Sequence, residues 1–171
     1  MGWGTVKVST RLFSMRTEQQ TPLEPSERPT ISANVLLLGY AGLLPPLGLI
    51  LADWLLPSGP IQWGGIVGPY AAVIYSFLGG SWWAFAMKED PPSTSLLVLA
   101  VSPPILALLT FFAGPQLQNI LLAVLIAISP GADYLFKLKG LVPPWWMRLR
   151  FRLSMGLAAL TVLAIYPSYF A

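Results

Sequence analysis

Five long apolar runs dominate this sequence, and they restrict what the chain can fold into more than any other feature does. They cover residues 33–56, 66–87, 96–113, 117–136 and 153–170. About 20 apolar residues are needed to cross a hydrocarbon core about 30 Å thick. Lipid offers no hydrogen-bond partners to a bare backbone, so each run must be a helix. The sequence therefore predicts an all-α fold, a polytopic integral membrane bundle of about five transmembrane helices.

The composition agrees with a membrane protein and removes several kinds of chemistry. Of the 171 residues, 55% are hydrophobic and only 10% are charged, whereas roughly a quarter of a soluble domain is charged. The chain has no cysteine and no histidine, so thiolate nucleophiles, disulfides and histidine ligands or bases are excluded. We therefore expect no catalytic residue, no metal and no cofactor, and we expect that the chain is not an enzyme.

The positive charges predict an orientation in the membrane. Lysine and arginine in short loops stay mostly on the cytoplasmic side. In a five-span arrangement, all ten basic residues fall on one side of the membrane: Lys7, Arg11, Arg16, Arg28, Lys88, Lys137, Lys139, Arg148, Arg150 and Arg152. This predicts an inside N-terminus and an outside C-terminus. A re-entrant pair formed by the third and fourth runs would keep the same orientation, and that alternative stays open.

The net charge of +3 follows from this topology and gives no reason to propose a nucleic-acid partner. Basic residues beside a bilayer are attracted to anionic headgroups. Membrane lipids are therefore the expected partners, with other membrane proteins as a second class.

The chain divides into a polar tail and a membrane domain. Residues 1–32 are predicted to be a disordered cytoplasmic tail, because residues 17–31 are polar and contain several prolines. Residues 33–171 form the predicted five-span domain. The first 16 residues contain three basic residues and no acid, which resembles a mitochondrial transit peptide. We favour the alternative that a shorter bacterial tail begins at Met15.

Small residues recur at every fourth position of the second run, which is expected to be the central helix. They are Gly68, Ala72, Ser76, Gly80 and Ala84. Close approach over small residues is how membrane helices associate, so these positions predict a buried helix-packing seam. A substrate groove lined by glycine is the alternative. On this prediction Gly80→Leu should disrupt the fold, whereas Leu78→Ala should be mild.

The segment PPWWMRLRFR before the fifth run is the most distinctive polar feature. It holds five candidates for contact with a lipid headgroup or a partner protein: Trp145, Trp146, Arg148, Arg150 and Arg152. Guanidinium groups bind phosphate oxygens in pairs. Anchoring of the topology, which needs only positive charge, is the alternative. It predicts that lysine can replace all three arginines.

Two acids lie near membrane depth, at Asp53 and Asp133. Acids inside a membrane are functional candidates by default, but neither lies at the centre of a run. Lys137 follows Asp133 by four residues and is its predicted partner.

Proline pairs at 45–46 and 103–104 predict kinks in the first and third helices. Such kinks could serve as the hinges of a transporter. Proline is also ordinary in membrane helices.

Three motifs carry a resemblance to a known family. The runs LGYAGLLP, YSFLGGSWWAFA and PPWWMRLRFRLS resemble, in the same order, the domain of unknown function family 3429, which is similar to animal transmembrane protein 69. The resemblance covers about residues 36–165. It implies a small multi-span protein of a bacterial or mitochondrial inner membrane, and it implies no reaction. A histidine often stands in this family where this chain has Trp82, so chemistry that depends on that histidine would be lost here.

These observations predict a non-catalytic scaffold, assembly or stabilising factor in an inner membrane. The bacterial inner membrane is favoured over the mitochondrial one. A small-solute transporter or channel subunit is the alternative function.

Overall fold

The computed structural model describes residues 31–56 and 61–165, and every regular element within them is a helix. The elements are α1 (Ala33–Ala41), α2 (Leu44–Leu55), η3 (Trp63–Ile66), α3 (Val67–Ala86), α4 (Thr94–Thr110), η4 (Phe111–Ala113), α5 (Pro115–Leu138) and α6 (Trp146–Leu163). The predicted all-α class is confirmed. Most of the predicted tail, residues 1–30, lies outside the described residues, as do residues 166–171 at the end of the fifth predicted run.

Three helices of the described chain are long and apolar enough to cross a membrane. They are Ala33–Leu55 (α1 with α2), Thr94–Ala113 (α4 with η4) and Pro115–Leu138 (α5). Helix α3 has 20 residues and α6 has 18, so both are of similar length but carry more polar and aromatic side chains. These two helices lie inside the bundle, where neighbouring helices rather than lipid surround much of their surface.

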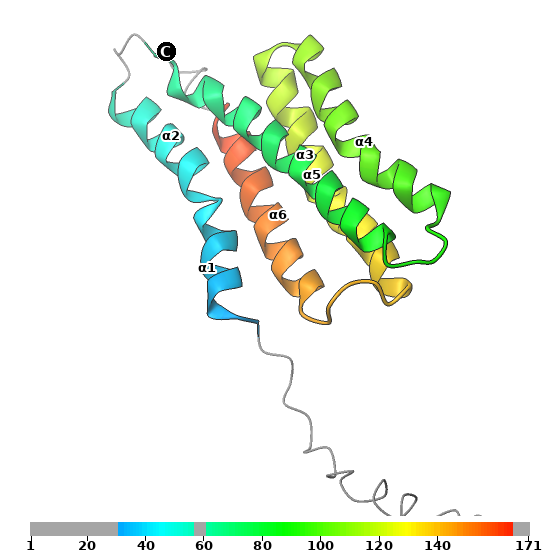
Figure 1. The fold of residues 1–171 in the computed structure, drawn as a ribbon. Coiled ribbons are helices and arrows are strands. Elements are labelled where there is room, and N and C mark those ends of the chain that lie inside the picture. The colour runs from blue at the N-terminus through cyan, green and yellow to red at the C-terminus, as the bar shows by residue number, and fades with distance from the viewer. Residues whose placement is uncertain (1–30, 57–60, 166–171) are drawn as a thin grey trace, which may run out of the picture. The chain divides into compact units, whose positions relative to one another are not determined.

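The helices form a bundle with α3 at its centre. Helix α3 packs against α2, α4, α5 and α6, which confirms that the second run is the central helix. The first span, α1 with α2, lies at one edge of the bundle, and α4 lies at the opposite edge (Figure 1). The interior is built from the side chains of α3, α5 and α6, joined by buried positions of α4.

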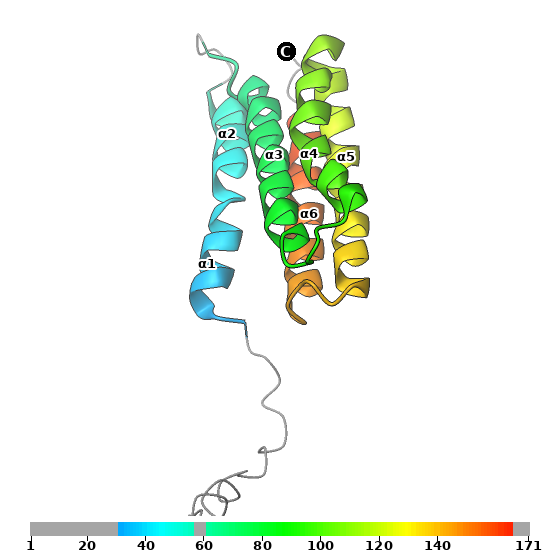
Figure 2. The same ribbon diagram turned by 45° about the vertical axis from the view of Figure 1, so that its right-hand side comes forward.

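Two connections meet at one end of the bundle. Figures 1 and 2 show the α3–α4 and α5–α6 connections at the same end as the start of α1. The Lys88 ammonium donates to the Leu141 carbonyl (2.9 Å), and Lys139 forms an ion pair with Glu89 (2.7 Å). The hydrogen bond from Lys139 lowers the pKa of the Glu89 carboxyl. The contribution of this ion pair is therefore present at neutral pH and is lost as the pH falls through that lowered pKa.

The first span is interrupted at its proline pair, where a kink was predicted. Helix α1 ends at Ala41 and α2 begins at Leu44, with Pro45 and Pro46 in its first turn. A proline has no N–H for the carbonyl four residues earlier, so Pro46 leaves the Gly42 carbonyl without a helical donor. The Tyr70 hydroxyl of α3 donates to this carbonyl over 2.8 Å. The break is therefore tied to the central helix.

Removing that donor should weaken the bundle. Tyr70→Phe is expected to lower the free energy of unfolding by about 1–3 kcal/mol, because the Gly42 carbonyl would be left without its partner. Tyr134→Phe is the matched control, since Tyr134 is 48% exposed and should change stability by less than about 0.5 kcal/mol. Thermal unfolding in detergent measures both changes. Equal stability of the two variants would contradict this role of Tyr70.

Pro103 of α4 and Pro130 of α5 are each compensated by the serine that precedes them. Pro103 frees the Leu99 carbonyl, and the Ser102 hydroxyl donates to it (2.8 Å). Pro130 frees the Ile126 carbonyl in the same way, and Ser129 donates to it (2.7 Å). The Leu99 and Ile126 carbonyls therefore keep a donor. Pro104 also frees the Ala100 carbonyl, which lies against Gly79 of α3.

Helix α6 begins earlier than predicted. The predicted fifth run starts at residue 153, but the helix starts at Trp146. The prediction counted the three arginines as part of a loop, because charge is costly at membrane depth. The arginines instead occupy the first two turns of the helix, and Arg150 turns into the bundle, where it is only 7% exposed.

Candidate functional site

A buried carboxylate lies where α3, α5 and α6 meet. Asp133 of α5 has no exposed surface. Its Oδ1 accepts hydrogen bonds from the indole Nε1 atoms of Trp82 (3.0 Å) and Trp146 (2.8 Å). Its Oδ2 accepts a hydrogen bond from Nε of Arg150 (3.0 Å). Both oxygens of the carboxylate are therefore bound by donors from the neighbouring helices.

The guanidinium of Arg150 is enclosed on several sides. Its Nη2 lies 3.3 Å from Oγ of Ser129, and its Cζ lies 5.9 Å from the centre of a Trp146 ring. Stacking of a guanidinium on an indole is favourable when both are removed from water. Arg150 therefore pairs with Asp133 while also contacting a hydroxyl and an aromatic face.

A short serine network completes the group. A hydroxyl has one proton to donate and two lone pairs to accept with, and the Ser129 proton goes to the Ile126 carbonyl. The Ser129 oxygen is thus an acceptor for Arg150 and for Ser154, whose Oγ lies 3.3 Å away. We call these six side chains the Asp133 cluster: Trp82, Ser129, Asp133, Trp146, Arg150 and Ser154.

Helical spacing brings the cluster together. Ser129 and Asp133 are four residues apart on α5, while Trp146, Arg150 and Ser154 follow one another at intervals of four on α6. Residues four apart lie on one face of a helix. The two helices run in opposite directions along their shared interface, so one polar column faces the other. Trp82 adds the contact from α3.

An aromatic layer surrounds the ion pair. The rings of Trp82 and Phe136 are stacked with centres 6.4 Å apart, and Phe85 meets the Trp146 ring edge-on at 5.0 Å. Phe136 is fully buried. These rings exclude water from the cluster and leave its hydrogen bonds in a low dielectric, where they are stronger than in water.

The cluster is suited to holding helices together. Three donors use both oxygens of Asp133, and the positive charge of Arg150 balances its negative charge. Metal binding by protein ligands usually needs several histidine, cysteine or carboxylate groups. The described residues include no group of three or more such side chains.

The prediction that Lys137 pairs with Asp133 was wrong. Lys137 is exposed, and its ammonium lies 5.8 Å from the centre of the Tyr134 ring rather than against Asp133. Asp133 faces the interior of the bundle, where a lysine would lose its hydration. Arg150 and two indoles reach the carboxylate from other helices, which a pattern within one helix cannot reveal.

The segment before the fifth run divides into an inner and an outer part. Trp146 and Arg150 belong to the Asp133 cluster, and Trp145 lies half-buried beside Trp146, with ring centres 6.0 Å apart. Arg148 and Arg152 are exposed. The five predicted contact residues therefore do not form one site.

The predicted packing seam holds only over its first part. Gly68 and Ala72 are buried and Ser76 is half-buried, but Gly80 and Ala84 are exposed. No atom lies within 4 Å of the position that a Cβ of Gly80 would occupy. Four residues turn a helix by about 400°, so each step of four drifts about 40° around the axis. After several steps the line of small residues has left the buried face.

The close approach in α3 occurs one residue earlier, at Gly79. A Cβ on Gly79 would lie 2.5 Å from the Ala100 carbonyl of α4 and 3.3 Å from the rings of Pro103 and Pro104. Pro104 removes the helical donor of that same carbonyl, so the oxygen projects toward α3. Glycine is required at position 79 because any side chain would collide with this backbone oxygen.

A second polar group lies toward the other end of the bundle. Gln118 and Asn119 of α5 are both buried, and both lie against Gly68 of α3. Nε2 of Gln118 is buried without a hydrogen-bond partner. Asp53 of α2 is half-buried and lies against Gly64. Asp53 stands out in the sequence as an acid, whereas the two amides do not, because they carry no charge.

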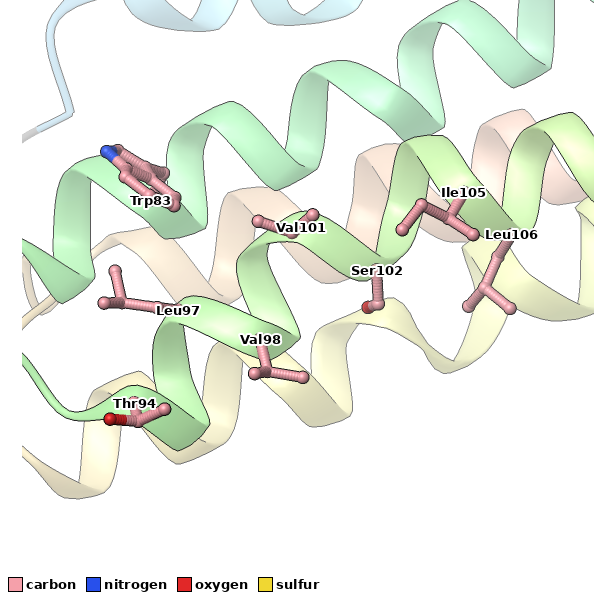
Figure 3. A pocket seen from close by; sticks show the side chains of 8 residues that line it. All are labelled: Trp83, Thr94, Leu97, Val98, Val101, Ser102, Ile105 and Leu106. Atoms are coloured by element: carbon pink, nitrogen blue, oxygen red, sulfur yellow. The ribbon is translucent and has the colours of Figure 1, made fainter.

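An open groove of about 390 Å³ runs along the outer face of α4. Figure 3 shows Trp83 of α3 together with seven side chains of α4 around it. The lining is Trp83, Thr94, Leu97, Val98, Val101, Ser102, Ile105 and Leu106. None of these side chains carries a charge at neutral pH, so the groove offers shape and apolar surface but no acid or base for chemistry.

Lysine should not replace arginine inside the Asp133 cluster. Arg150→Lys is expected to lower the free energy of unfolding by about 1.5–3 kcal/mol, because one ammonium cannot reach both Asp133 and Ser129 as the guanidinium does. The exposed Arg152→Lys is the control and should change stability by less than about 0.5 kcal/mol. Unfolding in detergent compares them. A tolerated Arg150→Lys would support the simpler requirement for positive charge alone.

The described chain is all-helical, and three of its helices are long and apolar enough to cross a membrane. Its buried charges are paired inside the bundle. These features define the chain as a helical integral membrane protein.

The sequence also matches a known family. The family described as "Protein of unknown function (DUF3429)" matches residues 31–166, and the chain belongs to this family, as its three motifs predicted. The chain is also 29% identical over 138 residues to a Xenopus tropicalis protein named Transmembrane protein 69. That match covers 77% of this chain and 50% of the relative, so the chain spans about half the length of the curated relative that it matches. No solved structure matches.

Proposed function

We propose that the chain is a non-catalytic scaffold of an inner membrane, which assembles or stabilises other membrane components. The observation that carries this proposal is that the charged groups of the Asp133 cluster are paired with one another. The carboxylate of Asp133 and the guanidinium of Arg150 bind one another and the side chains around them. A catalytic or transport site would need such groups to face a substrate.

The first span supplies the surface for such a role. Only 11% of its apolar window is buried within the chain, compared with 28% for α4 and 44% for α5. Helix α1 has no buried residue, and Leu37 and Leu38 are about 70% exposed. This edge of the bundle can contact another membrane protein without disturbing the interior.

The proposal includes a five-span topology with the N-terminus inside. Its support is that the described basic residues all lie at or near the end of the bundle where the α3–α4 and α5–α6 connections meet (Figure 2). Positive charge is retained on the cytoplasmic side. Reporter fusions after Thr30 and after Ala171 should report opposite sides of the membrane. Agreement between the two reporters would exclude an odd number of spans.

Crosslinking from the first span tests the scaffold role. A photoreactive residue at Leu38 or Leu51, both at least half exposed, should capture one discrete membrane protein in cells. Deleting the chain should then lower the abundance or assembly of that protein. The control is the same probe at Leu122, which is fully buried and should give no such product. Capture of lipid alone, with no change in any membrane complex, would contradict the proposal.

A small-solute transporter or channel subunit is the second candidate. The observation that favours it is the break between α1 and α2, since broken helices are common where transporters bind solutes. The bond from Tyr70 to Gly42 counts against a freely moving hinge. Uptake of a small solute by vesicles that contain the purified chain, with none by vesicles that lack it, would favour transport. The bacterial inner membrane is the proposed compartment, with the mitochondrial inner membrane as the alternative, and cell fractionation separates them.

A further inference from the structure

We propose that the exposed face of the first two turns of α6 binds the phosphate of an anionic phospholipid. Arg148 and Arg152 form this face, and Trp145 precedes it. The inference does not depend on the scaffold role, because it concerns a surface on the side of α6 away from the Asp133 cluster.

The two arginines are neighbours on one helix face. Residues four apart have Cβ atoms about 5–6 Å apart, which lets two guanidinium groups reach the same phosphate. Both side chains are exposed, whereas Arg150 between them is buried in the cluster. The face therefore presents two positive charges that the interior does not use.

The surrounding charges leave this face positive. Within residues 31–56 and 61–165 the ion pairs are Lys139 with Glu89 and Arg150 with Asp133. Neither Arg148 nor Arg152 is paired there. A negatively charged group from outside the chain is the natural complement to such a face.

The direction of α6 lets both guanidinium groups reach the headgroups. The helix begins at Trp146, at the same end of the bundle as the two basic connections (Figure 1). Side chains in a helix lean toward its N-terminus, which is here the headgroup side. Arg152 lies six residues, about 9 Å, along the helix from Trp146, and its side chain is long enough to reach back toward the headgroups. Trp145 lies where tryptophan anchors a membrane interface.

The binding of defined lipids to the purified full-length chain tests this proposal. Native mass spectrometry in mild detergent would compare phosphatidylglycerol with phosphatidylcholine of the same acyl chains. The parent chain should prefer phosphatidylglycerol, and R148Q/R152Q should lose roughly 10- to 30-fold of that affinity. The control K88Q/K137Q removes two exposed charges from the same end of the bundle and should keep the parental preference. R148Q/R152Q should unfold at the temperature of the parent, whereas K88Q/K137Q should unfold slightly lower because it loses the hydrogen bond from Lys88 to the Leu141 carbonyl.

Three outcomes would overturn the proposal. Equal binding of the two lipids by the parent would show no recognition of negative charge. Equal losses in R148Q/R152Q and K88Q/K137Q would show an effect of net charge rather than of this face. Displacement of phosphatidylglycerol by an excess of inorganic phosphate would show a site for free anions instead of a lipid headgroup.

Discussion

Replacing Asp133 with asparagine is expected to lower the free energy of unfolding by about 3–5 kcal/mol, because it leaves the buried charge of Arg150 without a partner. Asparagine has nearly the same shape, and its oxygen can still accept from Trp82 and Trp146. Its amide group would, however, face the donor at Nε of Arg150. The expected loss therefore reports the charge pair rather than a change in packing.

Asp53→Asn is the matched control for this prediction. Asp53 is a half-buried acid of the first span and forms no ion pair with the described residues. Its replacement should cost less than about 1 kcal/mol. Unfolding of the purified chain in detergent, followed by tryptophan fluorescence, measures both variants. An Asp133→Asn chain as stable as the parent would show that the ion pair does not hold the bundle.

Gly79→Leu is expected to prevent close packing of α3 against α4, with a loss of about 3 kcal/mol or more. The Ala100 carbonyl lies 2.5 Å from the position of the new Cβ, and a backbone oxygen cannot move aside as a flexible side chain can. The yield of monodisperse protein and its unfolding temperature should both fall sharply.

The neighbouring Gly80→Leu is the control, and it reverses the expectation from the sequence. Gly80 is exposed and faces open space, so leucine there should be tolerated. Leu78 is only 5% exposed, so Leu78→Ala should be the more damaging change of those two. A damaging Gly80→Leu with a tolerated Gly79→Leu would restore the seam as first predicted.

The fold class and the helices follow from the sequence because lipid permits few backbone structures. A lipid core leaves a backbone no choice but internal hydrogen bonds, so long apolar runs identify helices without any knowledge of contacts. The central position of α3 was predicted from its small residues, because small residues allow membrane helices to approach closely. The face they mark was only partly right, since spacing by four drifts away from the buried stripe that passes through Ala72 and Gly79.

The Asp133 cluster could be predicted only in part. Asp133 stood out as an acid at membrane depth, and Trp146 and Arg150 stood out within one distinctive segment. Their pairing depends on how α5 and α6 face one another, which no spacing within a single helix specifies. Trp82 is 51 residues from Asp133 along the chain, and its position followed from packing alone.

Some local signals were present in the sequence and carry physical meaning. Ser102 and Ser129 each stand directly before a proline. A serine in that place can donate to the carbonyl that the proline leaves free, which allows a helix to pass through proline in lipid. The first span has no serine before Pro45 or Pro46, and Tyr70 of α3 donates to the Gly42 carbonyl that Pro46 leaves free.

The coupling between Asp133→Asn and Arg150→Met tests most directly whether these charges hold the bundle together. Each single variant leaves one charge buried without its partner, whereas the double variant D133N/R150M removes both charges and keeps an acceptor for the two indoles. A double-mutant cycle in detergent would measure the coupling free energy. We predict that the double variant is more stable than the sum of the single losses allows, by about 2–3 kcal/mol. Losses that simply add would contradict the account, because they would show that the two residues do not stabilise one another.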